Sequence, residues 1–373
     1  MNRANLLALA KRVLMLPTAP YHEGYVKSFV MEFCRQLPNV RVGQDRAGNI
    51  IARYRRGATK SPLVFVAHMD HPGFEMLDGN RAEFLGGVPK EMFAAGVGIR
   101  FYAGSGRKRL PRTQESSSPR LVGEATVARF KASAWPKRKL VTLRVNGVLR
   151  RGDFGTWALP AFRVAEDKLH ALAIDDLLGT VVMLATLAEL SRRRTRAHVW
   201  CAFTRAEEVG FQAALALIRA KKIPKNALVV SVEMSKERPW ARIGQGPVVR
   251  VGDRTSIFDL NATACLLRAA ERCLQRDSGF RVQRCLMDGG TCEATAFVGF
   301  GYRAGGLCLP LGNYHNIGRN LRPRTEYVSL RDLEQLLKLT VAAAEEASSA
   351  SAADAVLRRR LISTLRTSPR ELK

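Results

Sequence analysis

Residue types that bind metal ions or transfer protons follow several apolar runs of the sequence. His68 and Asp70 come directly after one run, Glu207 and Glu208 follow a second, and Glu233 ends a third. Imidazole and carboxylate groups are ligands that suit zinc, and also cobalt or manganese. One such motif alone is a weak signal, but their repeated placement after apolar runs favours a metal site.

Two further groups of this kind lie elsewhere in the chain. Asp175 and Asp176 open a predicted helix, and His315 follows the last apolar run. Acid or imidazole groups at five element ends are enough for a two-metal site, in which one carboxylate bridges ions about 3.5 to 4 Å apart. A further carboxylate must stay free of metal to transfer protons. Asp176 fits a residue near the positive end of the helix dipole better than a ligand.

The elements that must position these groups alternate along the chain. Continuous apolar runs are typical of strands buried on both faces of a parallel sheet. Helical patterns separate them, which indicates an α/β fold with a mostly parallel sheet and helices on both faces. Sites in open sheets of this kind form outside the carboxyl ends of the strands. The runs are 62–67, 197–204, 227–233 and 305–311, and the helical patterns are 176–191, 211–221 and 257–275.

The stretch 74–165 differs, because it has few helical periods and many glycine, proline and β-branched residues. It predicts a small β-rich domain inserted into the α/β domain. We therefore expect a discontinuous catalytic domain of residues 1–73 and 166–350, an inserted domain of 74–165, and a basic C-terminal tail of 351–373. A chain of 373 residues is long enough for this division.

The 60 lysines and arginines outnumber the 33 aspartates and glutamates, which gives a formal net charge of +27. Such a surface can bind nucleic acid or anionic membrane. The basic residues are scattered, however, and no nucleic-acid-reading motif is recognisable, so we expect neither partner. The seven cysteines include no C-x-x-C pair, and no apolar run is long enough to span a membrane. These features predict a cytoplasmic protein.

Five segments, taken together, resemble the metal-site blocks of dinuclear metallo-aminopeptidases of the tetrahedral, glutamyl-aminopeptidase type, within the zinc exopeptidase superfamily. They are P-L-V-F-V-A-H-M-D, A-L-A-I-D-D-L-L-G, F-T-R-A-E-E-V-G, D-G-G-T-C-E-A-T-A and L-P-L-G-N-Y-H. The resemblance covers residues 6–339. A large insertion before the aspartate pair is the arrangement of this type, whereas the related carboxypeptidase and deacylase family places its extra domain late.

The resemblance implies a phosphorylase/hydrolase-like zinc-peptidase fold that binds two divalent metal ions, zinc first, with cobalt or manganese as alternatives. His68, Asp175 and Glu233 would hold one ion. Asp175, Glu208 and His315 would hold the other, so that Asp175 bridges the pair.

The resemblance also assigns roles in the reaction. Glu207 would be the general base, and Asp70 would hydrogen-bond His68 and fix its ring orientation. The substrates would be peptides with a free N-terminus, and a basic rim would favour acidic N-terminal residues. The protein would be a homo-oligomer, at least a dimer, in which the inserted domain makes dimer contacts and shapes access to the site.

Three positions depart from the family's pattern. His71 and Glu233 stand where the family usually has Glu and Asp, and Cys292 replaces the Asp of the G-G-T-D-A block. None of these changes removes a ligand or the base. Two alternatives stay open at this stage: a deacylase or carboxypeptidase of the related dinuclear zinc family, and a catalytically impaired homologue whose basic surface binds polyanions.

Overall fold

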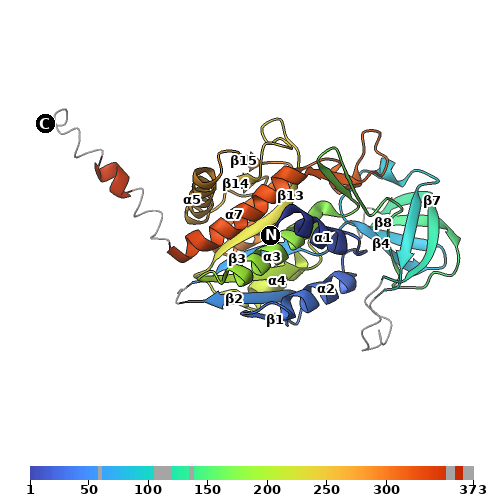
Figure 1. Ribbon diagram of the computed structural model, residues 1–373. Coiled ribbons are helices and arrows are strands. Elements are labelled where there is room, and N and C mark those ends of the chain that lie inside the picture. The colour runs from blue at the N-terminus through green and yellow to red at the C-terminus, as the bar shows by residue number, and fades with distance from the viewer. Residues whose placement is uncertain (58–60, 105–118, 134–137, 350–357, 364–373) are drawn as a thin grey trace.

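The computed structural model describes residues 1–57, 61–104, 119–133, 138–349 and 358–363. Its centre is an eight-stranded sheet in the order β1-β2-β12-β3-β13-β16-β14-β15, with helices packed against it (Figure 1). The strands are β1 (Val40–Gln44), β2 (Ile50–Arg56), β3 (Leu63–His68), β12 (Ala197–Thr204), β13 (Leu228–Lys236), β14 (Val248–Asp253), β15 (Gln283–Met287) and β16 (Arg303–Leu311).

The middle of this sheet is parallel and its flanks are mixed. β12, β3, β13 and β16 run parallel to one another. β2 pairs antiparallel with β12 and with β1, and β14 pairs antiparallel with β16 but parallel with β15. The expected mixture of a large sheet and helices is confirmed. The expectation of a mostly parallel sheet holds only for the central strands, which are the ones that lead to the predicted site.

Strand β3 explains why both faces of the sheet are covered. Its side chains alternate between the two faces, so Phe65 packs into one hydrophobic core and Val66 into the other. The first core also contains buried residues of α1 (Arg3–Leu14), α2 (Gly24–Arg35), α3 (Ile174–Arg193), α5 (Leu260–Arg276) and α7 (Leu330–Ser349). The second contains residues of α4 (Gln212–Arg219) and α6 (Glu293–Gly299).

Helix α3 is the central helix of the larger core. It packs against β3, β13, α1 and α7, and nearly all its side chains from Ile174 to Leu190 are buried. A helix that is apolar on all sides belongs in the interior. Its buried start, at Asp175 and Asp176, is therefore fixed beside the carboxyl ends of β3 and β13.

Between β3 and α3 the chain forms a closed barrel in the order β4-β5-β8-β7-β6-β9, seen beside the main sheet in Figure 1. Phe74, Phe84 and Trp157 fill it, with ring centroids 4.8 to 5.6 Å apart. The domain limits at 74 and 165 stay a prediction. The strands are β4 (Gly73–Asp78), β5 (Arg81–Leu85), β6 (Gly98–Tyr102), β7 (Leu121–Ser133), β8 (Arg138–Asn146) and β9 (Phe154–Trp157).

A small antiparallel sheet follows the barrel and links it to the end of the catalytic region. It is formed by β10 (Phe162–Ala165), β11 (Lys168–Ala171) and β17 (Glu326–Ser329). In its register, Ala171 lies opposite Glu326. Glu326 is therefore close to the chain that enters α3.

The predicted basic tail, 351–373, lies outside the described residues except for 358–363, which are helical. No helix within the described ranges is long and apolar enough to cross a membrane.

Candidate active site and metal centre

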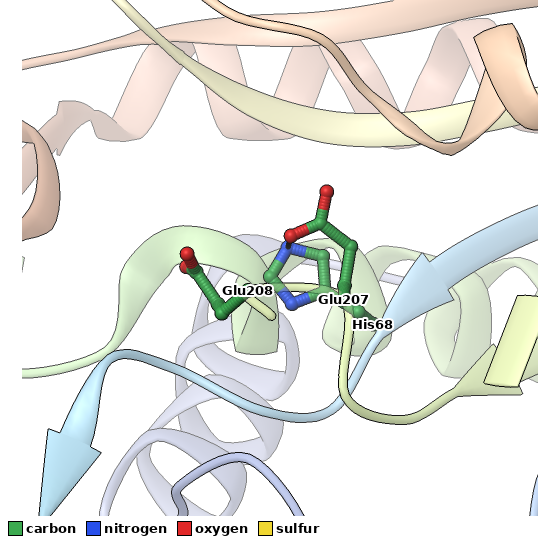
Figure 2. A group of neighbouring side chains, drawn as sticks. All are labelled: His68, Glu207 and Glu208. Atoms are coloured by element: carbon green, nitrogen blue, oxygen red, sulfur yellow. Dashed lines mark ion pairs between the residues drawn. The ribbon is translucent and has the colours of Figure 1, made fainter. Parts of the chain in front are cut away.

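The predicted site residues come together from five parts of the fold, four of them at the ends of elements and Glu233 within a strand. His68 ends β3, Glu207 and Glu208 follow β12, and Glu233 lies in β13. Figure 2 shows Glu207 and Glu208 on the segment after β12, with their side chains beside the His68 ring. Ligand atoms of His68, Glu207 and Glu208 lie within 4.8 Å of one another.

Asp175 lies between the two predicted histidines. Its Oδ1 is 3.3 Å from His68 Nε2, and its Oδ2 is 3.5 Å from His315 Nε2. His68 Nε2 is also 3.7 Å from Glu233 Oε1, and His315 Nε2 is 3.2 Å from Glu208 Oε1. Each oxygen of one carboxylate thus faces a different imidazole, which is the arrangement that a bridging ligand needs.

Asp176 also belongs to this cluster, although its sequence position favoured a role at the helix start alone. Its Oδ1 does accept the Gly179 N–H, at 3.1 Å. A carboxylate oxygen of Asp176, however, lies in a group with His68 and Glu233 whose ligand atoms are within 4.8 Å of one another. Asp176 is therefore a further candidate ligand beside the first ion.

Buried oxygen atoms without partners provide a test of whether metal ions fit here. Asp175 Oδ1, Asp176 Oδ2 and Glu208 Oε1 are buried, and none has a hydrogen-bond partner within the described part of the chain. Buried polar atoms are normally paired, and a set of imidazole and carboxylate donors suits zinc, cobalt or manganese. The residues present fit divalent metal ions.

The electrostatics agree with this conclusion. Burial alone would raise the pKa of Asp175, but the His315 and His68 imidazoles outweigh it and hold that pKa below its ordinary value. Burial alone would likewise lower the pKa values of the two histidines, yet the neighbouring carboxylates, chiefly Glu207 for His68 and Glu208 for His315, raise both well above the ordinary value. Without metal, the site therefore binds protons to offset its negative charge.

Glu207, unlike Asp175, does not lie between the two histidines. Its Oε2 lies 3.9 Å from His68 Nε2, and the carboxylate lines the cavity of the site. Burial, aided by the like charges of Glu208 and Glu233, raises its pKa well above the ordinary value, although His68 acts in the opposite direction. A raised pKa suits a carboxylate that accepts and then returns a proton.

Asp70 makes contacts beyond the predicted one with His68. Its carboxylate accepts the N–H groups of Glu207 at 3.0 Å and Glu208 at 3.1 Å. His68 Nδ1 lies 3.1 Å from the Asp70 main-chain oxygen and 3.6 Å from its Oδ1. The His68 ring is thus held mainly by the Asp70 backbone, while the carboxylate holds the turn that carries both glutamates.

Two buried positioning groups complete the site. His71 Nδ1 contacts the Asp175 carbonyl oxygen, and its Nε2 lies 3.0 Å from Asn316 Oδ1. Glu326, which sequence reasoning missed, accepts backbone N–H groups of Asp175 and His315. No motif marks Glu326, and only its pairing opposite Ala171 could have pointed to it.

A small cavity of about 30 Å³ opens beside the cluster. Asp175, Glu207, Glu233, Arg250 and Cys292 are among the residues that line it. A larger cavity of about 590 Å³ lies between α1, α3, α5 and α7 and contains none of the site residues. Of these two cavities, the small one is therefore the one that adjoins the candidate ligands.

Solved structures share this fold. Aminopeptidase APDkam598 of Desulfurococcus kamchatkensis is 22% identical, with a TM-score of 0.71 over 93% of this chain and 96% of its own. The TET1 peptidase of Pyrococcus horikoshii, which assembles into a tetrahedron or a large octahedral shell, is 20% identical, with a TM-score of 0.69 over 91% and 99%. The TET aminopeptidase of a marine sediment Thaumarchaeota archaeon is 17% identical, with a TM-score of 0.70 over 91% and 97%.

The match to a family sequence model identifies the family. The sequence model of the M42 glutamyl aminopeptidases matches residues 144–339, which include Asp175, Glu207, Glu208, Glu233 and His315. The resemblance seen in the motifs is confirmed, and neither the deacylase or carboxypeptidase alternative nor the polyanion-binding one is favoured. The chain belongs to the M42 glutamyl aminopeptidase family and is a metal-dependent aminopeptidase.

Proposed function

We propose that this chain removes N-terminal residues from peptides at the Asp175 cluster, with two zinc ions held there and cobalt or manganese as substitutes. His68, Glu233 and Asp175 would hold one ion, and Asp175, Glu208 and His315 the other. The observation that carries the proposal is the position of Asp175, whose two oxygens face two different imidazoles. When bound, the ions would acidify water and polarise the scissile carbonyl.

The protein's own groups would then move the protons. Glu207 would take a proton from the attacking water and transfer it to the leaving amine. Asp70 would keep Glu207 in place through its hydrogen bond to the Glu207 N–H. Burial of the cluster removes competing solvent and strengthens each electrostatic contact inside it.

The experiment is elemental analysis of the purified protein, together with hydrolysis of a free-amino peptide and its N-acetylated form. Two metal ions per chain and cleavage of the free-amino peptide alone are expected. Cleavage of the blocked peptide would instead support a deacylase. Fewer than two ions after reconstitution with zinc, cobalt or manganese would contradict the dinuclear site.

We further propose a preference for acidic N-terminal residues, based on Arg250. This arginine lines the cavity of the site, is 2% exposed, and donates Nη1 to Ser235 Oγ at 3.3 Å. Its Nε has no hydrogen-bond partner among the described residues, and the carboxylates of Glu233 and Asp253 act on its charge without a hydrogen bond to it. A buried guanidinium without a directly hydrogen-bonded counter-ion is costly. A carboxylate on the substrate side chain would supply that counter-ion.

A panel of aminoacyl-anilides tests this preference. The wild type should hydrolyse the Glu and Asp substrates faster than the Leu substrate, and Arg250→Met should lose most of the rate on the acidic substrates only. Arg242→Met, at an exposed arginine outside the cavity, is the matched control. Rates on Glu and Asp equal to or below the rate on Leu in the wild type would rule the preference out.

Assembly belongs to the same proposal. We expect at least a homodimer, with the barrel of β4 to β9 making subunit contacts and shaping access to the site. The support comes from the shared fold with proteins that form large shells. Light scattering of the purified chain after size exclusion would give the mass, and a monomer at micromolar concentration would contradict the expectation.

The absence of a nucleic-acid partner for the +27 surface stays a prediction.

A further inference from the structure

We propose that Glu326 is a positioning residue that places the second metal site by holding two of its ligands through their main chains. The inference rests on the two-metal function proposed above. The Glu326 carboxylate is assigned to no ion. It contacts the main chain of the ligands instead.

The contacts of Glu326 divide between its two oxygens. Oε2 accepts the N–H groups of Ile174 at 2.7 Å and Asp175 at 3.0 Å. Oε1 accepts the N–H of His315 at 2.8 Å. The side chain is fully buried, so these three donors account for the hydrogen bonds that its carboxylate needs. One rigid group thus sets the distance between the bridging ligand and the histidine of the second site.

A second set of contacts closes the network from the other side. His71 Nδ1 donates to the Asp175 carbonyl oxygen, and its Nε2 contacts Asn316 Oδ1 at 3.0 Å. Asn316 in turn donates Nδ2 to the Leu172 carbonyl oxygen at 2.7 Å. Hydrogen bonds therefore hold the peptide groups on both sides of Asp175. Asn316, the residue after His315, is bonded to Leu172 in the same segment.

The backbone around His315 needs this support. His315 and Asn316 have φ values of +54° and +63°, in the left-handed region that non-glycine residues adopt at a cost. The hydrogen bond from the His315 N–H to Glu326 is a contact that can hold this conformation. Without it, the imidazole would lose its fixed approach to Asp175 and Glu208.

The decisive variant is Glu326→Gln, because a glutamine has one acceptor oxygen and one donor nitrogen. The amide oxygen is expected to face the two donors, Ile174 and Asp175, which leaves the amide nitrogen against the His315 N–H. The Glu326→Gln variant should therefore bind the second ion more weakly. Outer-shell partners of metal ligands typically affect affinity by about 10- to 100-fold.

The measurement is titration of the metal-free protein with zinc in competition with a chromophoric chelator. One of the two ions should bind about 10- to 100-fold more weakly in Glu326→Gln, and the other should keep its affinity within about 3-fold. The weakened ion should be the one that His315→Ala loses, and the double variant should show no further loss. Unchanged affinity for both ions in folded Glu326→Gln would overturn the proposal.

Asp332→Asn is the matched control. Asp332 is also a buried carboxylate that accepts two backbone N–H groups, those of Gly244 at 2.6 Å and Gly246 at 2.8 Å, but it contacts no candidate ligand. It should lower the melting temperature and leave both zinc affinities unchanged. An equal loss of zinc affinity in this control would show that the titration reports general stability, and would overturn the proposal.

Glu326→Asp decides the matter if the glutamine variant does not fold. It keeps both acceptor oxygens but is one methylene shorter, so it should bind the second ion with an intermediate affinity. Wild-type affinity in this variant would overturn the proposal. If the wild type itself takes up fewer than two zinc ions, the proposed dinuclear function fails instead, and the two failures are thereby distinguished.

Discussion

Asp70 holds the main chain of Glu207, the residue proposed as the base. Its Oδ1 accepts the Glu207 N–H at 3.0 Å, and its Oδ2 accepts the next N–H, that of Glu208, at 3.1 Å. One carboxylate therefore positions a proton acceptor and a metal ligand at once. The first of these roles bears on the rate and the second on the binding of metal.

Replacing Asp70 by Asn should affect both roles, because an amide can accept only one of the two N–H groups and directs a donor at the other. We expect kcat to fall by about 10- to 100-fold, with weaker zinc binding by the metal-free protein. Steady-state kinetics and a zinc titration check this. Asp259→Asn, at the cap of α5, is the control and should change neither quantity. Wild-type kcat in the Asp70 variant would contradict the positioning role.

Glu207→Gln tests the base itself. An amide cannot accept the proton from water, so kcat should fall by about 100- to 10,000-fold. Metal content should stay at the wild-type value, because Glu207 is not assigned as a ligand. Glu271→Gln, at an exposed glutamate of α5, should leave the rate unchanged. A parallel loss of metal and activity in Glu207→Gln would assign this residue to metal binding instead.

The parts of the site that sequence could predict are those whose residue types are chemical signals. His68, Asp175, Glu208 and His315 each stand at an element end, and the pairing of β3 with β12 and β13 brings those ends together. The strands could be predicted because a parallel strand buried on both faces is apolar throughout.

Other features depended on long-range pairing that sequence does not encode locally. Glu326 reaches the site because β17 pairs with β11, and neither strand carries a motif. His71 stood out in the sequence only as a departure from the family's pattern, and its contacts with Asp175 and Asn316 became visible only in the structure. The antiparallel flanks of the sheet were missed for a related reason, since strand direction is set by connections and not by composition.

Metal uptake should release protons. The neighbouring carboxylates raise the pKa values of His68 and His315 well above the ordinary value, so both imidazoles hold their protons more tightly in the metal-free protein than a free imidazole does. A ligand must lose its proton before it binds a metal ion. Zinc affinity should therefore fall as the pH falls, since protons then compete more strongly for the same nitrogen atoms.

Calorimetric titration of zinc in buffers with different ionisation enthalpies measures this release directly. We expect a net release of protons near pH 7, to which each histidine contributes up to one. His315→Ala should reduce the number released by up to one. A binding heat that is independent of the buffer would show that no net proton is released, and that the histidines are neutral before metal binds.

Gly179 of α3 lies directly against the Asp176 side chain. A Cβ at this position would overlap the Asp176 carboxylate, whose Oδ1 accepts the Gly179 N–H at 3.1 Å. Alanine normally stabilises the interior of a helix by about 1 kcal/mol relative to glycine. Here we expect the opposite sign, a loss of about 1 to 3 kcal/mol in the free energy of unfolding, because the carboxylate must move in a packed core.

Gly299→Ala in α6 is the matched control, since a Cβ there would meet no heavy atom within 4 Å. It should leave the free energy of unfolding unchanged or raise it by about 0.4 to 1 kcal/mol. Urea unfolding of both variants gives these values, and zinc titration shows whether displacement of Asp176 reaches the site. Because Asp176 lies in one group with His68 and Glu233, Gly179→Ala should weaken the ion at those residues. Full stability together with unchanged zinc binding in Gly179→Ala would mean that the Asp176 carboxylate can move without cost and is not a ligand.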